Sequence, residues 1–594
     1  MRLKISKSKN STNFYIIKDY TKNKKRTTKI VERIGNLETV KKLAGDRHYN
    51  EWLKDYIREY NEKHTDKKEE IIIKKYIGKQ IPKNAKTLFN IGHLFLSKIY
   101  NKLQLNEICE DISSKYQFKF NLNDILSLLI FGRIIYPSSK LKTHHLSKRF
   151  LQAPEIKLHD IYRGLSYLNK EMDYIQEKLF ENSLSLIKRN SRVIYFDCAN
   201  YYFEINDEDE LKKYGINKQH RPNPQVGMGL FMDGDGLPLA MNIFPGNASE
   251  TKQLIPTESK IVNKFKLNDT RLIICTDAAL CTDEIKRYNV NNGRGFVITQ
   301  SLKKLKSVYL REALNPSDWR LPGENRNLYN LKEIENNEEL TNKYYDAIFY
   351  KIIFTETASV KQDLIVTYSI KYKNYQQQIR GSQITRALKK MNTNSNGEKL
   401  KFTNNQNDYR RFISEKVAVN NIEEVVSYEY SINKDLIAEE EKYEGFYALT
   451  TNLRADITSI LKVVKGRWEI EESFRIMKHD FLARPVELSR EDRITAHFLT
   501  CYIALLIYRI LEKKLDSNYT TAQIIETLRE MKVYESTGDG YIPVYERTDI
   551  TDDLHDTFGF RTDYEIMNYK FIDKIFAKIS EWKSTHYFLE NKSS

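Results

Sequence analysis

Two aspartates stand where a carboxylate could bind a cation. Asp197 follows the apolar run 193–196, and Asp277 follows the mostly apolar run 272–276. Runs of this kind are typical of buried strands, so each carboxylate should emerge at an edge of a sheet, where it can be solvated or bind metal. Each Asp taken alone is more often a turn or helix-cap residue, and that alternative stays open.

A third acidic residue, Glu471, lies in a segment with helical periodicity. At about 100° per residue, Arg467, Glu471 and Lys478 project within roughly 40° of one another. An adjacent apolar stripe would pack this helix on a sheet; it consists of Ile470, Phe474 and Met477. The line of Arg, Glu and Lys indicates a metal-binding carboxylate flanked by phosphate contacts. A surface salt-bridge ladder has the same spacing, so the periodicity does not decide between the two.

The elements that position these residues follow from the patterns around them. Residues 1–80 contain strand-like runs at 14–17 and 27–34 that flank a lysine-rich turn, which predicts a β-hairpin followed by a charged linker. Residues 81–188 are helical in pattern. Their most apolar helix, Asp124–Ile135, has Asn123 as its expected cap and ends before Pro137.

The remaining segments alternate between strand and helix patterns. Residues 189–300 hold short apolar runs typical of strands, and residues 457–512 return to helical periodicity. Residues 301–450 are rich in Lys, Asn and Tyr and contain strand-like runs, which predicts a mostly β insertion. Residues 521–594 form a C-terminal region. The expected fold class is therefore multidomain α/β.

The segment 232–237 contains two further candidate metal ligands, Asp233 and Asp235. Each is followed by a glycine, and the segment lies between two strand-like runs. Asp-Gly dipeptides in this setting form hairpin turns without any ligand. We therefore assign both aspartates to a turn.

Positive charge is concentrated on one probable helix and is in excess over the whole chain. The helix carries Lys140, Lys142, Lys148 and Arg149, which could bind phosphates, although a solvated helix face explains them equally well. The 594 residues include 96 Lys and Arg against 80 Asp and Glu, a net charge of +16. Such an excess favours a polyanionic partner, nucleic acid first, although a Lys-rich proteome would produce it too.

Cysteine usage and hydropathy limit the compartment. The five cysteines form no CxxC pair, which disfavours zinc or a disulfide framework. The N-terminus lacks the apolar run of a signal peptide, and the longest apolar stretch, 498–511, is too short to span a bilayer. We expect a soluble, intracellular protein without a membrane partner.

The spacing Arg467-(3)-Glu471-(6)-Lys478 resembles the helix motif of a large class of bacterial insertion-sequence transposases with a DDE active site. Other motifs of that class occur in the same order: 195–197, 220–222, 236–239, 244–247, 276–277, 445–447, 484–486 and 493–498. The resemblance covers about residues 190 to 515 and extends more weakly to the N-terminal hairpin and to 557–561. The chain departs from the motif at Val464, where a tyrosine belongs; valine cannot donate a hydrogen bond to phosphate.

The resemblance implies an RNase H-like fold, in which a mixed sheet carries two aspartates and a later helix supplies a glutamate. Residues 189–300 and 451–520 would form this catalytic core, and 301–450 the β-rich insertion that several relatives carry. Asp197, Asp277 and Glu471 would be the catalytic metal ligands. Arg467 and Lys478 would contact phosphates of the transposon ends.

The implied activity is two-metal-ion phosphodiester chemistry. Two Mg²⁺ ions about 3.5–4 Å apart, or Mn²⁺ in their place, would activate the nucleophile and stabilise the leaving oxygen. Asp197 would bridge both ions. The same site would cleave the element's ends and join them to a target, because only the nucleophile changes. Three carboxylates without metal would repel one another and raise their own pKa values, so local order should depend on metal.

The implied partners are double-stranded DNA, as both transposon ends and target, and a second copy of the chain, because two ends must be paired. The implied location is the bacterial cytoplasm, in association with the nucleoid. Among the N-terminal elements, we expect the helical region around 140–149, rather than the hairpin, to bind the terminal inverted repeats.

Two alternatives stay open at this point. The chain could be an RNase H-like nuclease without strand transfer, or an inactive DNA-binding derivative of a transposase. All three acidic positions are intact, which disfavours the inactive derivative.

Overall fold

The computed structural model describes residues 2–8, 11–22, 25–64, 71, 73, 75–81, 83–215, 222–267, 271–357, 360–393, 408–419, 425–536 and 538–580. The expected linker at 62–70 and the motif at 220–222 lie largely outside these residues. The chain divides into two units, residues 1–82 and 83–594.

The first unit is a three-stranded antiparallel sheet followed by two helices. Strands β2 (Ser11–Lys22) and β3 (Lys25–Asn36) form the expected hairpin, and β1 (Arg2–Ser8) pairs with the free edge of β2. Helices α1 (Leu37–Ala44) and α2 (Tyr49–His64) follow. One sheet face packs on these helices through a core that contains Phe14, Ile16, Ile34, Val40 and Leu53.

The second unit begins with the predicted helical region, preceded by one short strand. Strand β4 (Leu88–Asn90) is followed by α3 (His93–Lys102), α4 (Leu105–Tyr116), α5 (Leu122–Ile135), α6 (Lys140–Ser147), α7 (Leu158–Lys170) and α8 (Met172–Leu186). The predicted cap of α5 is wrong by two residues. The Asn121 side chain accepts the capping hydrogen bond from Asp124 N, while Asn123 accepts a bond from the Tyr100 hydroxyl (2.7 Å).

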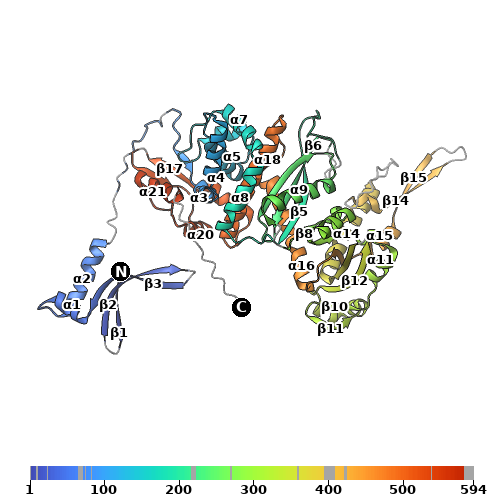
Figure 1. The fold of residues 1–594 in the computed structure, drawn as a ribbon, viewed down its shortest axis with the longest axis horizontal. Helices are drawn as coiled ribbons and strands as arrows, with labels where there is room; N and C mark the ends of the chain where they lie inside the picture. Colours follow the sequence, from blue (N-terminus) through green and yellow to red (C-terminus); the bar gives the residue numbers. More distant parts are fainter. Residues whose placement is uncertain are drawn as a thin grey trace. The chain divides into compact units, whose positions relative to one another are not determined.

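A ten-stranded mixed sheet organises the centre of this unit (Figure 1), in the order β11-β10-β12-β13-β16-β9-β8-β5-β6-β7. Its strands are β5 (Val193–Tyr202), β6 (Gln225–Asp233), β7 (Pro238–Pro245), β8 (Ile273–Thr276), β9 (Gly295–Thr299), β10 (Trp319–Leu321), β11 (Glu324–Tyr329), β12 (Phe349–Thr357), β13 (Val360–Tyr368) and β16 (Phe446–Thr451). Strands β5, β8 and β9 are mutually parallel, and the other pairings are antiparallel.

The predicted insertion at 301–450 extends this sheet and includes helices. Its strand β16 pairs with β9. Four further strands, β13, β12, β10 and β11, continue the central sheet beyond β16. Its other elements are η3 (Leu302–Lys304), α11 (Ser307–Leu314), α12 (Leu331–Glu335), α13 (Glu338–Lys343), α14 (Ile370–Thr393), η4 (Tyr409–Phe412), β14 (Ile413–Val419), β15 (Val425–Ile432) and α15 (Lys434–Glu441). The expectation of a mostly β segment therefore missed α14, a 24-residue helix.

Helices cover both faces of the strands that carry the two aspartates. On one face, Phe196, Ile274 and Phe296 pack in a core shared with α9 (Glu250–Lys264) and α10 (Asp283–Asn291). The opposite face, which includes Tyr195, packs in a larger core shared with α16 (Ile457–Gly466), α17 (Trp468–Arg475) and α18 (Glu491–Lys514). A π-helical turn, η5 (Ile476–Asp480), follows α17 directly.

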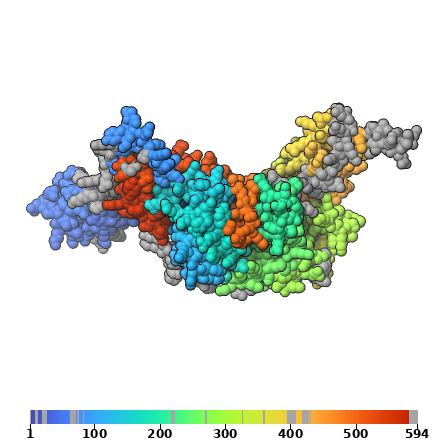
Figure 2. Space-filling view, turned by 90° about the horizontal axis from the view of Figure 1, so that it is seen from above, coloured from blue at the N-terminus to red at the C-terminus, as the bar shows by residue number. Residues whose placement is uncertain are grey.

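Helix α18 is the central helix of the second unit. By length and hydropathy it could cross a membrane, but 94% of its most apolar window is buried inside the protein. It packs against α3, α5 and α7. Figure 2 shows the orange surface near residue 490 between the cyan helical region and the green β6–β7 region, so three distant segments meet on one face.

The C-terminal elements pack back on the start of the second unit. They are α19 (Thr521–Glu530), β17 (Lys532–Ser536), β18 (Gly540–Pro543), α20 (Asp549–Phe558) and α21 (Tyr569–Ser580). Strand β17 pairs with both β18 and β4. Residues 521–580 therefore complete the helical region at 83–188 and are not a separate appendage.

The aspartates of the β6–β7 turn have structural partners. Asp233 is fully buried, forms an ion pair with Arg189 (2.6 Å), and accepts hydrogen bonds from the backbone N–H groups of Asp235 and Leu237. Arg189 also donates to Ser183 and to the carbonyls of Leu237 and Pro238. The assignment of this segment to a hairpin turn agrees with these contacts.

Removing the Asp233 carboxylate should destabilise the protein strongly. Asp233→Ala leaves the buried charge of Arg189 without its partner, which costs about 3–5 kcal/mol in comparable buried pairs. The measurement is the free energy of unfolding of the full chain in urea. Asp235→Ala, in the same turn but partly exposed, is the matched control and should cost less than about 1 kcal/mol. Equal losses for the two variants would contradict this account.

Candidate active site

Asp197 and Asp277 lie side by side in the interior of the ten-stranded sheet, where β8 ends. Strands β5 and β8 are parallel, with Tyr195 opposite Cys275, and continuing this register by two residues places Asp197 opposite Asp277. Because strand side chains alternate, both aspartates face the same side of the sheet as Tyr195, the side covered by α16 and α17. The expectation that each aspartate ends its strand agrees with Asp277, which directly follows β8, but is wrong for Asp197, because β5 continues to Tyr202 in pairing with β6.

Asp277 also has a local structural role. Its Oδ1 accepts hydrogen bonds from the backbone N–H groups of Ala279 (2.8 Å) and Leu280 (3.3 Å), which caps the short 3-10 helix η2 (Ala278–Leu280). The cap fixes one carboxylate oxygen of Asp277.

Helix α17 is held on the aspartate face from two sides. The predicted apolar stripe is buried, with Ile470, Phe474 and Met477 at most 5% exposed. The Arg509 guanidinium of α18 donates to the Glu469 carbonyl (3.0 Å) and to the Ser473 hydroxyl (2.9 Å). The backbone that carries Glu471 is therefore fixed relative to the sheet.

The junction of α16 and α17 approaches β5 closely at Gly466. The Tyr195 hydroxyl donates to the Val463 carbonyl (2.9 Å), and a Cβ added at Gly466 would lie 2.2 Å from that hydroxyl oxygen. Only glycine permits this approach without a shift of the helix. The spacing between the aspartates and Glu471 therefore depends on Gly466.

Arg467 lies among the three candidate carboxylates. It forms an ion pair with Glu471 (2.8 Å), and its own side chain is 20% exposed. Burial lowers the pKa of its guanidinium, but four acidic groups outweigh burial and raise that pKa: Tyr447, Glu471, Asp197 and Asp277. A cation held at this point offsets the mutual repulsion of the carboxylates.

Asp197, Asp277 and Glu471 do not form a compact group of ligand atoms among the described residues. Among the described residues, the group Asp552, His555 and Asp563 is the one whose ligand atoms all lie within 4.8 Å of one another. The Glu471 side chain is 57% exposed and is paired with Arg467.

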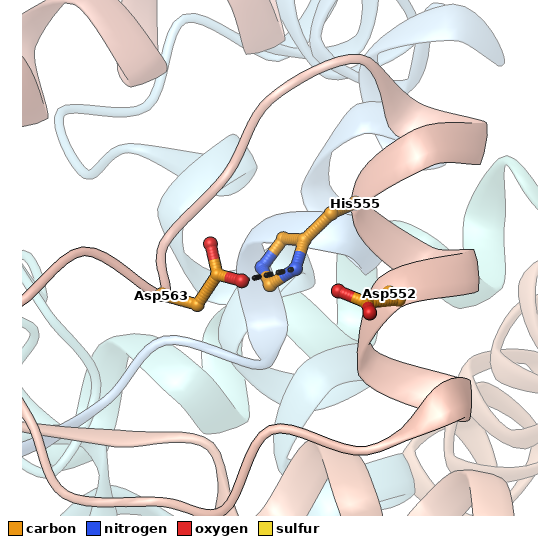
Figure 3. Close-up of side chains that lie close together, drawn as sticks. All are labelled: Asp552, His555 and Asp563. Carbon is orange, nitrogen blue, oxygen red and sulfur yellow. Dashed lines mark ion pairs between the residues drawn. The ribbon is translucent and has the colours of Figure 1, made fainter. Parts of the chain in front are cut away.

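The cluster of Asp552, His555 and Asp563 is a structural ion-pair network (Figure 3). Arg561 contacts Asp552 (2.5 Å) and Asp563 (2.6 Å), and Arg547 contacts the same two carboxylates. Burial lowers the pKa of His555 to about 4, and its Nε2 accepts a hydrogen bond from the Thr562 N–H. Arg547 and Arg561 pair with both carboxylates. Arg561, the last residue of the motif 557–561, therefore has a structural role in this network.

Tyr447 is a site residue that the sequence analysis did not single out. It lies on β16, lines an open cleft of about 590 Å³, and its hydroxyl is 2.6 Å from the Thr299 hydroxyl. It is the first of the acidic groups that raise the pKa of Arg467. Its position in the motif 445–447 was visible in the sequence, but its approach to Arg467 depends on the pairing of β16 with β9.

Lys478 does not continue the line of Arg467 and Glu471 on a regular α-helix. It lies within the π-helical turn, half-buried, with its Nζ 5.3 Å from the Tyr201 ring centre. The prediction assumed a constant rotation of about 100° per residue along the helix. The wider π-helical turn changes the direction in which the Lys478 side chain projects.

The predicted phosphate contact at Lys140 is wrong. Its side chain is buried, its Nζ lies 2.9 Å from His497 Nδ1, and burial lowers its pKa to about 7. His497 belongs to the motif 493–498 and also approaches the Ala483 carbonyl, so this pair is a packing feature. Lys142, Lys148 and Arg149 are exposed and can still reach a phosphate.

Substitution of Gly466 should displace α17. We expect Gly466→Ala to lower the free energy of unfolding by about 1–3 kcal/mol, because a Cβ overpacks the contact with Tyr195. Tyr195→Phe removes the clashing oxygen, so the double variant should lose less than the sum of the two single variants. The measurement is urea unfolding in a double-mutant cycle. Strictly additive losses would show that the two residues do not interact.

Comparison with known proteins places this arrangement in a family. The model of a family described as the transposase DDE domain matches residues 203–507, a range that includes Asp277 and Glu471 and begins shortly after Asp197. No curated protein sequence matches the chain. Among solved structures, piggyBac transposase in its synaptic complex with hairpin DNA matches with a TM-score of 0.35 and 8% identity, over 82% of this chain and 84% of that chain. Because the family model spans just over half of the sequence, the chain belongs to the transposases with a DDE domain, DNA-cutting enzymes of a family that uses divalent metal ions.

Proposed function

We propose that this transposase cuts at the terminal inverted repeats of a mobile DNA element and joins the freed ends to target DNA, with Asp197, Asp277 and Glu471 as the ligands of two divalent cations. The observation that carries the proposal is that Arg467 forms an ion pair with Glu471 and also interacts electrostatically with Asp197 and Asp277. They come from two adjacent parallel strands and from a helix that is anchored on the same sheet face.

The donor set suits Mg²⁺ or Mn²⁺. The candidate ligands are carboxylate oxygens, which hard divalent cations prefer. Cys198 lies next to Asp197, but burial and the neighbouring acidic groups raise the pKa of its thiol well above the usual range. The thiol therefore stays protonated and does not compete for the cation.

Different residues of the chain would have different roles in the reaction. When bound, the two ions would activate the attacking water or 3′-hydroxyl and stabilise the leaving oxygen. The ion pair between Glu471 and Arg467 would break, and Glu471 would become a ligand of a cation. The planar guanidinium of Arg467 could then donate hydrogen bonds to a DNA phosphate. Lys478 would contact a second phosphate near the cleavage point.

We also propose that the catalytic core is RNase H-like and that the chain belongs to the bacterial insertion-sequence class. Strands β7, β6 and β5 are antiparallel neighbours, β8 and β9 run parallel to β5, and the candidate ligands leave β5, β8 and the later helix α17. These observations support the RNase H-like core of the proposal. A dimer assembled on DNA is part of the proposal, because two ends must be brought together.

Tyr447 is proposed to replace the tyrosine that the helix motif lacks at Val464. Its hydroxyl lies beside Arg467 at the border of the open cleft. A hydroxyl in this position can donate to the same phosphate that Arg467 would bind. The contact missing from the helix would then come from β16.

Neutral substitutions of the three carboxylates should abolish cleavage and preserve DNA binding. Asp197→Asn, Asp277→Asn and Glu471→Gln should each reduce cleavage and strand transfer by at least about a hundredfold, because several kcal/mol of transition-state stabilisation depend on the cations. The measurement is a strand-transfer assay on DNA that carries the element's own ends, with Mg²⁺ and with chelator.

Matched control residues are available in α17 and in the β6–β7 turn. Glu472→Gln lies beside Glu471 but is paired with Arg475, and Asp235→Asn lies in the β6–β7 turn. Both should retain activity within a few-fold. Full strand transfer by any one of the three carboxylate variants would remove that residue from the site.

The role of Tyr447 has its own test. Tyr447→Phe should reduce cleavage roughly ten- to a hundredfold, the loss expected for one transition-state hydrogen bond to a charged group. Adding Val464→Tyr to this variant should restore activity, since it returns the hydroxyl to the helix. Tyr443→Phe, which lines the same cleft but donates to Glu439, is the control. A fully active Tyr447→Phe chain would contradict the assignment.

A further inference from the structure

The positive charge of the chain is concentrated in its first unit. Residues 1–82 contain 22 Lys and Arg against 11 Asp and Glu, a net charge of +11 out of the total of +16. Within this unit, residues 1–36, which form the three-stranded sheet, contain 11 basic and 2 acidic residues, a net charge of +9. The large second unit is close to neutral by comparison.

The two faces of this sheet differ in what covers them. Phe14, Ile16 and Ile34 are buried against α1 and α2. On the opposite face Tyr15 lies at the centre, with Lys4 opposite it on β1 and Arg33 opposite it on β3. Arg2 and Asn13 share this face because they are two residues from Lys4 and Tyr15 along their strands.

Apart from Ile17, which is buried opposite Arg2, and its partner Ile30, the described residues of the uncovered face are basic or polar. The side chains of Arg2, Lys4 and Arg33 are exposed. Arg33 donates to the Asn13 side chain (3.2 Å), which holds the guanidinium along the face. The acidic residue Glu32 belongs to the other side, where it accepts a hydrogen bond from Tyr56 of α2 (3.0 Å). Lys7, Lys18 and Lys29 are exposed on the same side as Glu32, so basic residues occur on both faces, and Arg2, Lys4 and Arg33 are those of the face that α1 and α2 leave uncovered.

We propose that this sheet face binds the element's terminal DNA in the major groove. The proposal deepens the proposed function, since it assigns the recognition of the ends to a named surface. Two or three strands spaced about 4.8 Å apart fit a groove that is roughly 12 Å wide. Lysine and arginine on the face suit phosphates, and Asn13 and Arg33 offer donors for base edges.

This surface is better suited to the task than the helix favoured by the sequence. On α6 and the residues after it, Lys140 is buried against His497. The exposed Lys148 and Arg149 lie beside Lys86, whose pKa is lowered by burial and by these two charges. That surface can bind phosphate, but it offers no ordered array of donors such as the one at Lys4, Tyr15 and Arg33.

Duplex binding by the full chain tests the proposal. A triple variant, Arg2→Gln, Lys4→Gln and Arg33→Gln, is compared with a control triple, Lys41→Gln, Lys42→Gln and Lys54→Gln, whose exposed lysines lie on α1 and α2. Both remove three charges from the same unit. The probes are a duplex of roughly 30 base pairs from the element's end and a scrambled duplex of equal length, each about three helical turns.

The sheet variant should bind the end duplex at least tenfold more weakly than wild type and lose its preference over the scrambled duplex. Its salt slope should fall by roughly 2 to 3, as expected for three lost phosphate contacts. The control triple should bind within about threefold of wild type. Binding is measured in chelator, so that the carboxylates at Asp197, Asp277 and Glu471 have no part in the result.

Three results would overturn the proposal. The first is unchanged binding of the end duplex by the sheet variant, and the second is equal weakening of binding in the sheet and control variants. The third is unchanged DNA binding together with altered self-association of the sheet variant. This third result would show that the face is an interface between copies of the chain. Thermal unfolding of each variant accompanies the binding measurement. If the triple variant is unfolded, Lys4→Glu alone replaces it, with the same expected direction.

Discussion

The proposed site requires Asp197, Asp277 and Glu471 to be held on one face of the sheet before any cation or DNA binds. Asp197 and Asp277 are adjacent because β5 and β8 are parallel neighbours in register, and α17 brings Glu471 to the same face. Like charges at short range disfavour ionisation unless a cation offsets them. Arg467 supplies that cation within the chain, and the burial of its guanidinium strengthens the interaction. The distance from helix α17 to strands β5 and β8 is then fixed by three residues, Gly466, Tyr195 and Arg509.

The sequence predicted the local parts of this site well. A polar residue at the end of an apolar run, as at Asp197 and Asp277, is a local signal, and so is the apolar stripe beside Glu471. Asp233 and Asp235 were assigned correctly to a turn because Asp-Gly chemistry is also local. The prediction that failed assumed that Lys140 is exposed. Lys140 belongs to a basic run but is buried, because α18 brings His497 against it.

Contacts between distant segments could not be predicted from one sequence. Tyr447 reaches Arg467 only because β16 pairs with β9, and strand-like runs do not specify their partners. For the same reason the insertion looked like a separate β segment, although its strands continue the central sheet. The π-helical turn at Lys478 is also invisible to a fixed helical period. In the first unit the hairpin was evident, but the set of residues on the uncovered sheet face could be identified only from the register.

The central claim is that two divalent cations bind among Asp197, Asp277 and Glu471. The most direct measurement is anomalous scattering from crystals of the full chain grown with Mn²⁺ and duplex DNA. The account predicts two peaks about 3.5–4 Å apart between these carboxylates, with Glu471 released from Arg467 and the guanidinium turned toward phosphate. Mn²⁺ bound elsewhere, with the Glu471–Arg467 ion pair still intact in the DNA complex, would contradict it.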